Sequence, residues 1–330
     1  MTMDVVKTES SFESAGRYTL REPAARIAVK TWSPVGVGAD CAPRGILQIN
    51  HGMQEYVDRY DSFARAAAAQ GWLVVGMDFI GHGDSAAGIS ELGFTGVRVP
   101  GGRNPFIEDM HSLRSLTQAQ WPGVPYVMFG HSMGSFVLRA YLGLHGAGLA
   151  AAVISGTGTM PAGMVVAAKI LLGLMQVNHL PDYRSRLFSN LSIGAYNKPF
   201  SKNGGPRTEV DWLSRDTEQV DRYVADPRCG GVFTLAADRE LMDSIGRANA
   251  VRSFAHTPHD LPILLLSGEQ DPVGANGKGV RAVAQAYSRA GVRDLSLKLY
   301  AGARHEMLNE LNRAEVVADI LAWLDQRVAA

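Results

Sequence analysis

The chain has 330 residues, 46% of them hydrophobic, and its 32 basic residues balance 32 acidic ones. This balance gives no long-range field of one sign, so we expect no nucleic-acid partner. Cys41 and Cys229 could form one disulfide at most, which excludes a disulfide framework and favours two reduced cysteines. The length fits one large domain with an insertion, because single cores stop growing at roughly 250–300 residues.

The first twenty residues are mostly polar and lack the apolar core of a signal peptide, so they are predicted to be a polar lead-in. Further along, no Lys, Arg, Asp or Glu occurs between Ala140 and Ala168. Pro161 and several glycines interrupt this stretch, which favours a strand and a loop over a membrane span. We therefore expect a soluble, cytoplasmic protein.

Short apolar runs alternate with helix-like stretches over most of the chain. The runs are predicted to be strands, and several are continuously apolar, as strands covered on both faces are. This alternation predicts an α/β fold with a mostly parallel sheet flanked by helices. The predicted strands cover residues 26–32, 45–50, 72–78, 125–130, 149–156, 262–268 and 295–300, and the predicted helices cover residues 58–70, 104–120, 133–145, 278–290 and 308–327.

The alternation lapses between about residues 157 and 240, where an inserted helical cap is predicted. Residues 1–156 and 241–330 would then form the two parts of the core. The apolar run 164–177 fits two interpretations equally well: a helix packed on the body, or a lid suited to an acyl chain. The run contains Lys169 and is shorter than the roughly 20 residues that span a bilayer. Transient contact with a membrane surface through the cap extends the lid interpretation.

One serine lies in a Gly-x-Ser-x-Gly pattern, Gly130-His131-Ser132-Met133-Gly134. The pattern alone is weak, but here it follows an apolar strand and precedes a helix-like stretch. A tight turn between a strand and a helix lifts the serine hydroxyl clear of the sheet. The backbone N–H of Met133 would then point toward an oxyanion at the start of the helix. We predict that Ser132 is a nucleophile.

A serine needs a base, and the base needs a carboxylate that orients it. Of nine histidines, His305 is the candidate, because it lies in a loop between the last strand and the final helix. Asp271 directly follows the strand after the cap and is the predicted acid, with Glu269 as the alternative. The order Ser132, Asp271, His305 is the order of an α/β-hydrolase triad.

The second oxyanion donor is expected in the loop after the strand at 45–50. There we assign the role to the N–H of Met53, because Gly52 lets the backbone approach a ligand closely. Gly52 and His131 are predicted to line the substrate site, with the His131 side chain pointing away from the serine. The sequence has no dinucleotide fingerprint, P-loop or zinc motif, so we expect no cofactor and no metal.

Five segments together resemble the α/β-hydrolase superfamily, and within it the monoacylglycerol lipase and lysophospholipase branch. They are NHGMQEYVDRY, DFIGHGDS, GHSMGS, SGEQDPVG and ARHEMLNE, and the resemblance covers nearly the whole chain after about residue 20. It implies an α/β-hydrolase fold with a helical cap, the same triad and oxyanion donors, and a loop shaped by His51, Gly52 and Glu55. Tyr56 departs from the branch, where many relatives carry a second histidine, and so does the pair Phe79-Ile80, which replaces a more polar pair.

These features predict a serine ester hydrolase that acts through an acyl-enzyme. Monoacylglycerols or other single-chain lipid esters are the favoured substrates, and a short-chain carboxylesterase is the first alternative. An acyltransferase or an aminopeptidase on the same scaffold is a second alternative; a receptor with little turnover belongs to a different class. An aminopeptidase would need cap carboxylates to hold a substrate amine, and the candidates are Asp211, Asp216, Glu218 and Asp221. Because arginines alternate with them, a solvated helix face is favoured. The oligomeric state stays open.

Overall fold

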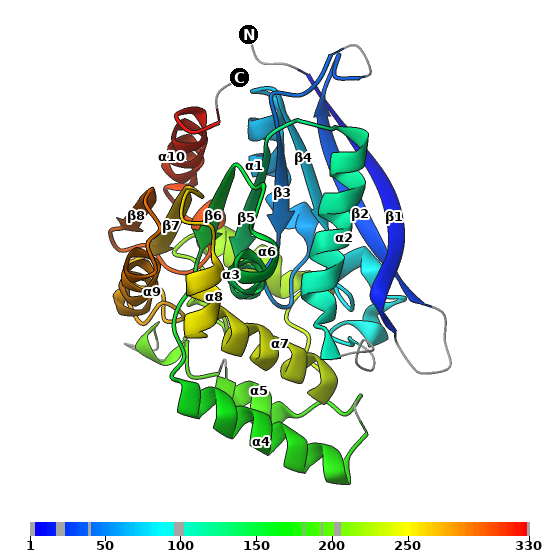
Figure 1. Ribbon diagram of the computed structural model, residues 1–330. Coiled ribbons are helices and arrows are strands. Elements are labelled where there is room, and N and C mark those ends of the chain that lie inside the picture. The colour runs from blue at the N-terminus through cyan, green and yellow to red at the C-terminus, as the bar shows by residue number, and fades with distance from the viewer. Residues whose placement is uncertain are drawn as a thin grey trace.

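The computed structural model describes residues 4–17, 24–38, 41–95, 102–180, 182–192, 194–200 and 206–328. Within these ranges one sheet of eight strands forms in the order β1-β2-β4-β3-β5-β6-β7-β8 (Figure 1). β1 pairs antiparallel with β2, β2 pairs antiparallel with β4, and the remaining pairs are parallel. The strands are β1 (Val5–Arg17), β2 (Ala24–Pro34), β3 (Gly45–Asn50), β4 (Trp72–Met77), β5 (Tyr126–His131), β6 (Ala151–Ser155), β7 (Ile263–Gly268) and β8 (Leu295–Tyr300).

All seven predicted strands are confirmed as β2 to β8, and the predicted fold class is confirmed with them. The prediction of a polar lead-in at the N-terminus is wrong, because residues 5–17 form β1 at the edge of the sheet. β1 has only β2 beside it, and an edge strand tolerates the polar side chains that hide it in the sequence. Phe12 and Val5 are its apolar residues that pack against the core clusters.

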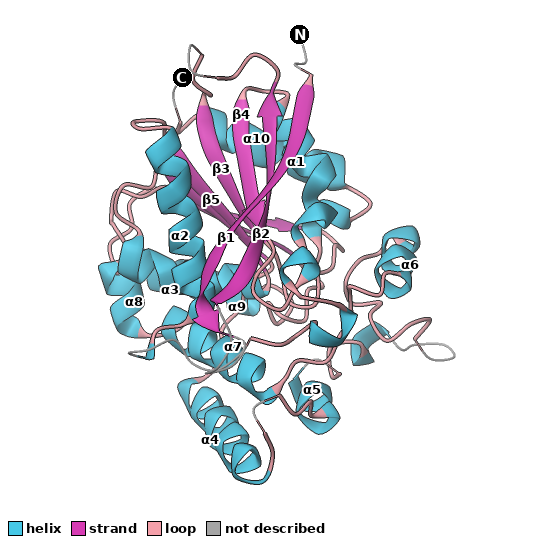
Figure 2. Ribbon diagram, turned by 90° about the vertical axis from the view of Figure 1, so that its right-hand side faces the viewer, coloured by secondary structure: helices cyan, strands magenta, loops and turns pink. Residues whose placement is uncertain are grey.

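Helices cover both faces of the sheet (Figures 1 and 2). Along β5, Val127 and Phe129 face one apolar cluster while Tyr126 and Met128 face the other, as the alternation of a strand requires. The first cluster contains side chains of α1 (Asp61–Ala68) and α10 (Arg313–Asp325), and the second contains side chains of α2 (Pro105–Gln120), α3 (Met133–His145), α8 (Val251–His256) and α9 (Lys278–Arg289). The five predicted helices correspond to α1, α2, α3, α9 and α10.

The segment between β6 and β7 carries α4 (Ala162–Asn178), α5 (Arg186–Ser192), α6 (Thr217–Ala225), α7 (Leu235–Ala248) and α8. α7 packs against α3 of the core, and α4 packs against α7. α4 therefore lies at the end of the molecule farthest from the two termini (Figure 2). The boundaries of the cap remain predictions, and the one at residue 240 falls inside α7. Among the described residues, no helix has both the length and the apolar character needed to cross a membrane.

Candidate active site

Ser132 lies in the tight turn between β5 and α3. Its backbone has φ of 50° and ψ of −118°, a conformation that strains a residue with a side chain by about 1–3 kcal/mol. The flanking glycines make the turn sterically feasible. A Cβ on Gly130 would lie 2.6 Å from the carbonyl oxygen of Gly134, and one on Gly134 would lie 2.2 Å from that of Asn50. The Ser132 N–H donates to the carbonyl oxygen of Ser155 at 3.0 Å, which anchors the turn to β6.

His305 and Asp271 form a buried pair. The Nδ1 of His305 donates to Oδ1 of Asp271 at 3.0 Å, and neither residue is more than 1% exposed. Asp271 also accepts from the Ser267 hydroxyl and from the Val273 N–H, both at 2.9 Å, so its orientation is fixed. Burial alone would lower the pKa of His305, but the charge and hydrogen bond of Asp271 outweigh it and raise that pKa. The alternative acid, Glu269, is exposed.

Ser132 and His305 each lie close to a glycine that is also next to the His131 ring. A Cβ on Gly52 would lie 3.2 Å from the Cβ of Ser132, and one on Gly156 would lie 3.0 Å from Cε1 of His305. Trp212 of the cap segment packs against His305, with ring centroids 4.8 Å apart. Ser132, Asp271 and His305 thus follow β5, β7 and β8 at the carboxyl edge of the sheet, and their action as a triad remains a prediction.

The loop after β3, residues 51–56, is called the oxyanion loop below. His51 anchors this loop through both of its ring nitrogens. Its Nε2 accepts a hydrogen bond from the Phe79 N–H at 2.9 Å. Because Nε2 is the acceptor, Nδ1 carries the proton and donates to the Gly52 carbonyl oxygen at 2.7 Å. Burial lowers the pKa of His51 to about 4, so its ring is neutral at pH 7. The Gly52 N–H donates to Glu55 Oε1 at 2.5 Å and is occupied.

The two assigned oxyanion donors are free. Within the described ranges, neither the Met53 N–H nor the Met133 N–H makes a hydrogen bond. Met133 is the first residue of α3, so the helix dipole adds to the positive potential at its N–H. Met53 is half-buried and follows Gly52, whose own N–H points to Glu55. The assignment of Met53 and Met133 to an oxyanion site remains a prediction that this geometry supports.

His131 lies beneath the turn and is 5% exposed. Its ring is 4.6 Å from that of His305, and its Nδ1 is 3.4 Å from the Ser155 hydroxyl. Burial and then the neighbouring His305 lower the pKa of His131 to about 4, so it stays neutral. Gly52 is buried between Ser132 and His131. Both residues surround the nucleophile, and their predicted contact with substrate remains a prediction.

A cluster of charged side chains beside His305 was missed by the sequence reasoning. Arg59 contacts both Glu55 and Glu306, and Tyr60 donates to Glu55 at 2.7 Å. The resemblance pointed to Glu55, and Glu306 directly follows His305. No local pattern, however, pairs Arg59 with a residue 247 positions away.

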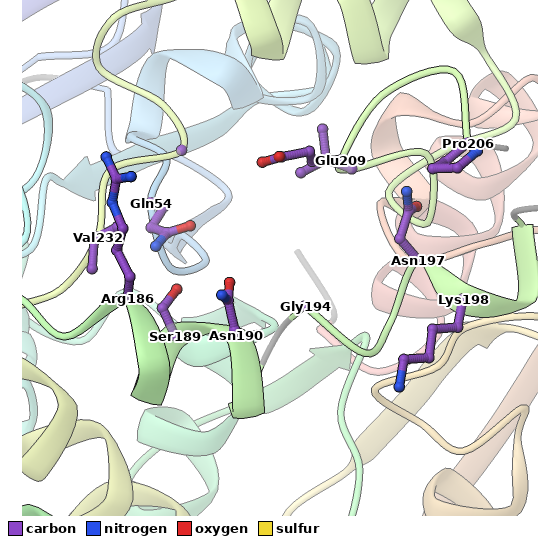
Figure 3. A pocket seen from close by; sticks show the side chains of 12 residues that line it. Gln54, Arg186, Ser189, Asn190, Gly194, Asn197, Lys198, Pro206, Glu209 and Val232 are labelled. Carbon is purple, nitrogen blue, oxygen red and sulfur yellow. The ribbon is translucent and has the colours of Figure 1, made fainter.

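A pocket of about 680 Å³ opens between the cap segment and the oxyanion loop. Figure 3 shows Gln54, next to Met53, on one side of it and Asn197 on the other. The side-chain oxygen of Asn197 accepts a hydrogen bond from the backbone N–H of Trp212 at 3.0 Å. Asn197 therefore connects the pocket to Trp212, the residue that packs against His305. Three charged side chains line the pocket without an ion pair to any described residue: Arg186, Lys198 and Glu209.

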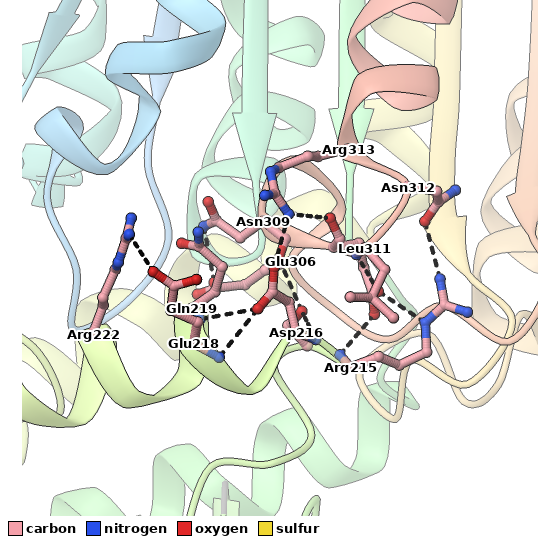
Figure 4. Close-up of polar contacts among 12 residues, drawn as sticks. Arg215, Asp216, Glu218, Gln219, Arg222, Glu306, Asn309, Leu311, Asn312 and Arg313 are labelled. Atoms are coloured by element: carbon pink, nitrogen blue, oxygen red, sulfur yellow. Dashed lines mark hydrogen bonds and ion pairs between the residues drawn. The ribbon is translucent and has the colours of Figure 1, made fainter.

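The cap carboxylates considered for an aminopeptidase are bonded elsewhere. Asp216 pairs with Arg313 of α10 at 2.8 Å, as Figure 4 shows. Glu218 pairs with Arg222 at 2.5 Å. Asp221 pairs with Arg207, and Asp211 accepts from the Arg207 and Thr208 N–H groups. In the part of the chain that the structure describes, no group of three or more His, Cys, Asp or Glu side chains could hold a metal ion.

The sheet order, the serine turn and the buried His–Asp pair define an α/β-hydrolase. More specifically, the chain belongs to the family described as "Serine aminopeptidase, S33", whose model matches residues 41–312. The resemblance noted in the sequence is thereby confirmed.

Relatives cover nearly all of the chain. It is 27% identical to the monoacylglycerol lipase of Mycolicibacterium smegmatis over 327 residues. The matched residues cover 96% of this chain and 97% of the relative. It is also 27% identical to the human monoglyceride lipase, over 90% of this chain and 86% of the relative. Among solved structures, a thermostable carboxyl esterase from Bacillus coagulans, crystallised with glycerol, is 27% identical with a TM-score of 0.86, covering 98% of this chain and 99% of that one.

Proposed function

We propose that this chain hydrolyses single-chain lipid esters through an acyl-enzyme on Ser132, with monoacylglycerols as the favoured substrates. The coarser conclusion, that the chain is an ester hydrolase, follows from its family and its full-length similarity to lipases and an esterase. The observation that carries the proposal is the hydrogen bond between His305 and Asp271 beside a strained serine.

In the proposed mechanism, Ser132 attacks the ester carbonyl while His305 takes its proton. Asp271 keeps Nδ1 of His305 protonated, so Nε2 is the free base, and its charge stabilises the imidazolium that forms. The N–H groups of Met53 and Met133 donate hydrogen bonds to the oxyanion. His305 then protonates the leaving alcohol, activates a water molecule that attacks the acyl-enzyme, and returns the proton to Ser132.

The cap supports a lipid substrate. α4 packs on the body through Val165 and Leu172, which are buried, while its opposite face is apolar and exposed. Val177 on that face is 80% exposed, and the other exposed members are Met164, Val166, Ile170 and Leu174. A contiguous exposed apolar face on a soluble chain marks an interaction site. We place this face against the lipid surface from which the substrate is drawn, with the helix lying along the surface.

The alternatives fit the structure less well. An aminopeptidase needs a free carboxylate for the substrate amine, and the cap candidates are occupied by arginines and backbone N–H groups. The exposed carboxylate in the pocket, Glu209, is the remaining candidate for that role. A short-chain esterase would have no use for the apolar face of α4. A receptor would not need the buried His–Asp pair, whose desolvation is costly.

Turnover of a graded series of substrates tests this proposal. We expect p-nitrophenyl esters to be hydrolysed faster from acetate to octanoate, and a monoacylglycerol to be preferred over a lysophospholipid with the same acyl chain. A maximum at acetate would refute the lipid substrate but leave the hydrolase intact. Faster cleavage of an amino-acid p-nitroanilide would favour the aminopeptidase, and failure of a fluorophosphonate probe to label Ser132 would favour the receptor.

A further inference from the structure

We propose that Arg59 is a positioning residue of this site, which joins the oxyanion loop to the loop of His305 and balances the charge around that histidine. The proposal rests on the proposed function, because it assigns a role within the same triad. It concerns a side chain that touches none of the reacting atoms.

The guanidinium of Arg59 holds two carboxylates from opposite sides of the site. Its Nη1 and Nη2 donate to Oε1 and Oε2 of Glu306 at 2.6 and 2.7 Å, a bidentate pair. Nη1 also donates to Oε2 of Glu55 at 2.7 Å. Glu55 in turn accepts a hydrogen bond from the Gly52 N–H. Glu306 directly follows His305 in the chain. One side chain thus fixes the spacing between the predicted oxyanion donor and the base.

The cap contributes to the same junction. The Glu306 N–H donates to the carbonyl oxygen of Leu213 at 2.7 Å, and the Arg59 guanidinium lies over the ring of Tyr223 in α6 at 4.9 Å. Asn309 donates to Glu306 Oε2 at 3.0 Å, among the contacts drawn in Figure 4. Arg59 therefore has no freedom to move without displacing either the oxyanion loop or the loop of His305.

The charges around His305 are unevenly balanced. Asp271 faces it from the end of β7, and Glu306 and Glu55 lie on the side of Arg59, while His131 is neutral and Trp212 is uncharged. Arg59 thus compensates one of two carboxylates. Burial opposes ionisation of Glu306, but the charge of Arg59 outweighs it and holds the pKa of Glu306 below its usual value. Both carboxylates favour the imidazolium form of His305.

A buried ion cluster is weak evidence for a role in stability, because apolar residues of similar volume often stabilise a core equally well or better. Burial of Arg59, Glu55 and Glu306 next to a catalytic base is therefore better explained by geometry and charge. A merely structural cluster would change the free energy of unfolding when it is altered, but it would not move the pH profile of the reaction.

The test compares four variants on a soluble substrate, p-nitrophenyl butyrate: Arg59→Met, Arg59→Lys, Glu306→Gln and Arg65→Met. Arg65 is the matched control, an arginine of α1 that pairs with Asp61 on the surface. We expect Arg59→Met to lower kcat by about 10²-fold while KM changes by less than about threefold, because the two loops lose their spacing. Arg59→Lys keeps the positive charge but cannot make the bidentate pair with Glu306, so kcat falls without a change in the pH profile.

The pH profile of kcat/KM is the readout that a purely structural role of Arg59 would leave unchanged. Activity is lost as pH falls through the pKa of His305. Glu306→Gln removes a negative charge, so the acid limb moves to lower pH by on the order of one unit or less. Arg59→Met leaves two uncompensated carboxylates, so the acid limb moves to higher pH. Arg65→Met leaves both kcat and the profile unchanged.

Equal kcat and acid limbs in Arg59→Met, Glu306→Gln and the wild type would overturn the role of Arg59 and leave the proposed function intact. Shifts of both variants in the same direction would also overturn it. If Arg59→Met fails to fold by circular dichroism, Arg59→Lys and Glu306→Gln carry the test, and wild-type behaviour of both overturns the proposal. Activity that survives Ser132→Ala would instead refute the proposed function itself.

Discussion

α3 and α4 are both rich in apolar side chains, but they lie in opposite environments. Every residue of α3 from Met133 to Leu142 is buried, between the sheet and α7. α4, which lies beside α7 (Figure 2), buries Val165 and Leu172, half-buries Ala168 and Met175 against the core, and leaves most of its other apolar residues exposed. The core therefore accounts for the composition of α3 but not for that of α4. The exposed face of α4 is the part that the proposed function assigns to a lipid surface.

The largest expected effect concerns Ser132, the residue that directly precedes α3. Ser132→Ala should lower the hydrolysis of p-nitrophenyl butyrate by about 10³-fold or more, because the remaining groups have no acyl acceptor to activate. The hydroxyl makes no described contact that the fold requires, so the free energy of unfolding should stay close to that of the wild type. Initial rates and urea unfolding measure the two effects. Hydrolysis within tenfold of the wild type would refute the mechanism.

The next effect concerns the packing of α3. In Gly134→Ala the new Cβ would lie 2.2 Å from the carbonyl oxygen of Asn50 and 2.5 Å from that of His51, both backbone atoms that have little room to shift. We expect a loss of about 3 kcal/mol or more in the free energy of unfolding, or no folded protein. Urea unfolding followed by circular dichroism measures it. A stability equal to that of the wild type would show that the contact between α3 and the end of β3 is looser than described.

The prediction of the fold from the sequence succeeded where burial leaves a local pattern. Strands covered on both faces, such as β5 and β7, are continuous apolar runs and are recognisable without any tertiary information. Ser132 and Asp271 directly follow such strands, so their place at the carboxyl edge of the sheet was predictable for the same reason. His305 follows β8, a half-buried edge strand, and its action with the other two residues stays a prediction. β1 was missed because an edge strand need not be apolar.

The cap and the charged cluster set the limit of that prediction. α7 packs against α3, but its sequence lies in a segment without the strand–helix alternation, so its place in the core left no local pattern. The contacts of Arg59 join positions far apart in the chain and depend on how the loops meet. For α4 the sequence left two interpretations open, and the structure shows that its two faces differ: one packs on α7 and the other is exposed.

A smaller effect on the hydrolysis of vesicle-bound substrate should distinguish an exposed leucine of α4 from an exposed leucine elsewhere on the surface. Leu174→Gln should lower hydrolysis of a monoacylglycerol in phosphatidylcholine vesicles by about fivefold to tenfold, because a buried leucine contributes about 1.5–3 kcal/mol at most to contact with lipid. Hydrolysis of p-nitrophenyl butyrate should not change. Leu144→Gln is the matched control, since Leu144 is an exposed leucine on α3 itself. Equal effects of the two variants on vesicle turnover would refute a lipid-facing role of α4.

The smallest expected effect is a gain in the free energy of unfolding. It comes from a glycine-to-alanine substitution in α4, which is the counterpart of Gly134→Ala in α3. A Cβ on Gly173, in the middle of α4, would meet no atom within 4 Å. Alanine at this position restricts the unfolded chain and favours the helix, so Gly173→Ala should raise the free energy of unfolding by about 0.5–1 kcal/mol. Because the two substitutions are chemically identical, their opposite signs would report only the surroundings of the two helices. A loss of stability in Gly173→Ala would mean that this part of α4 is packed against protein, and the contrast with α3 would then fail.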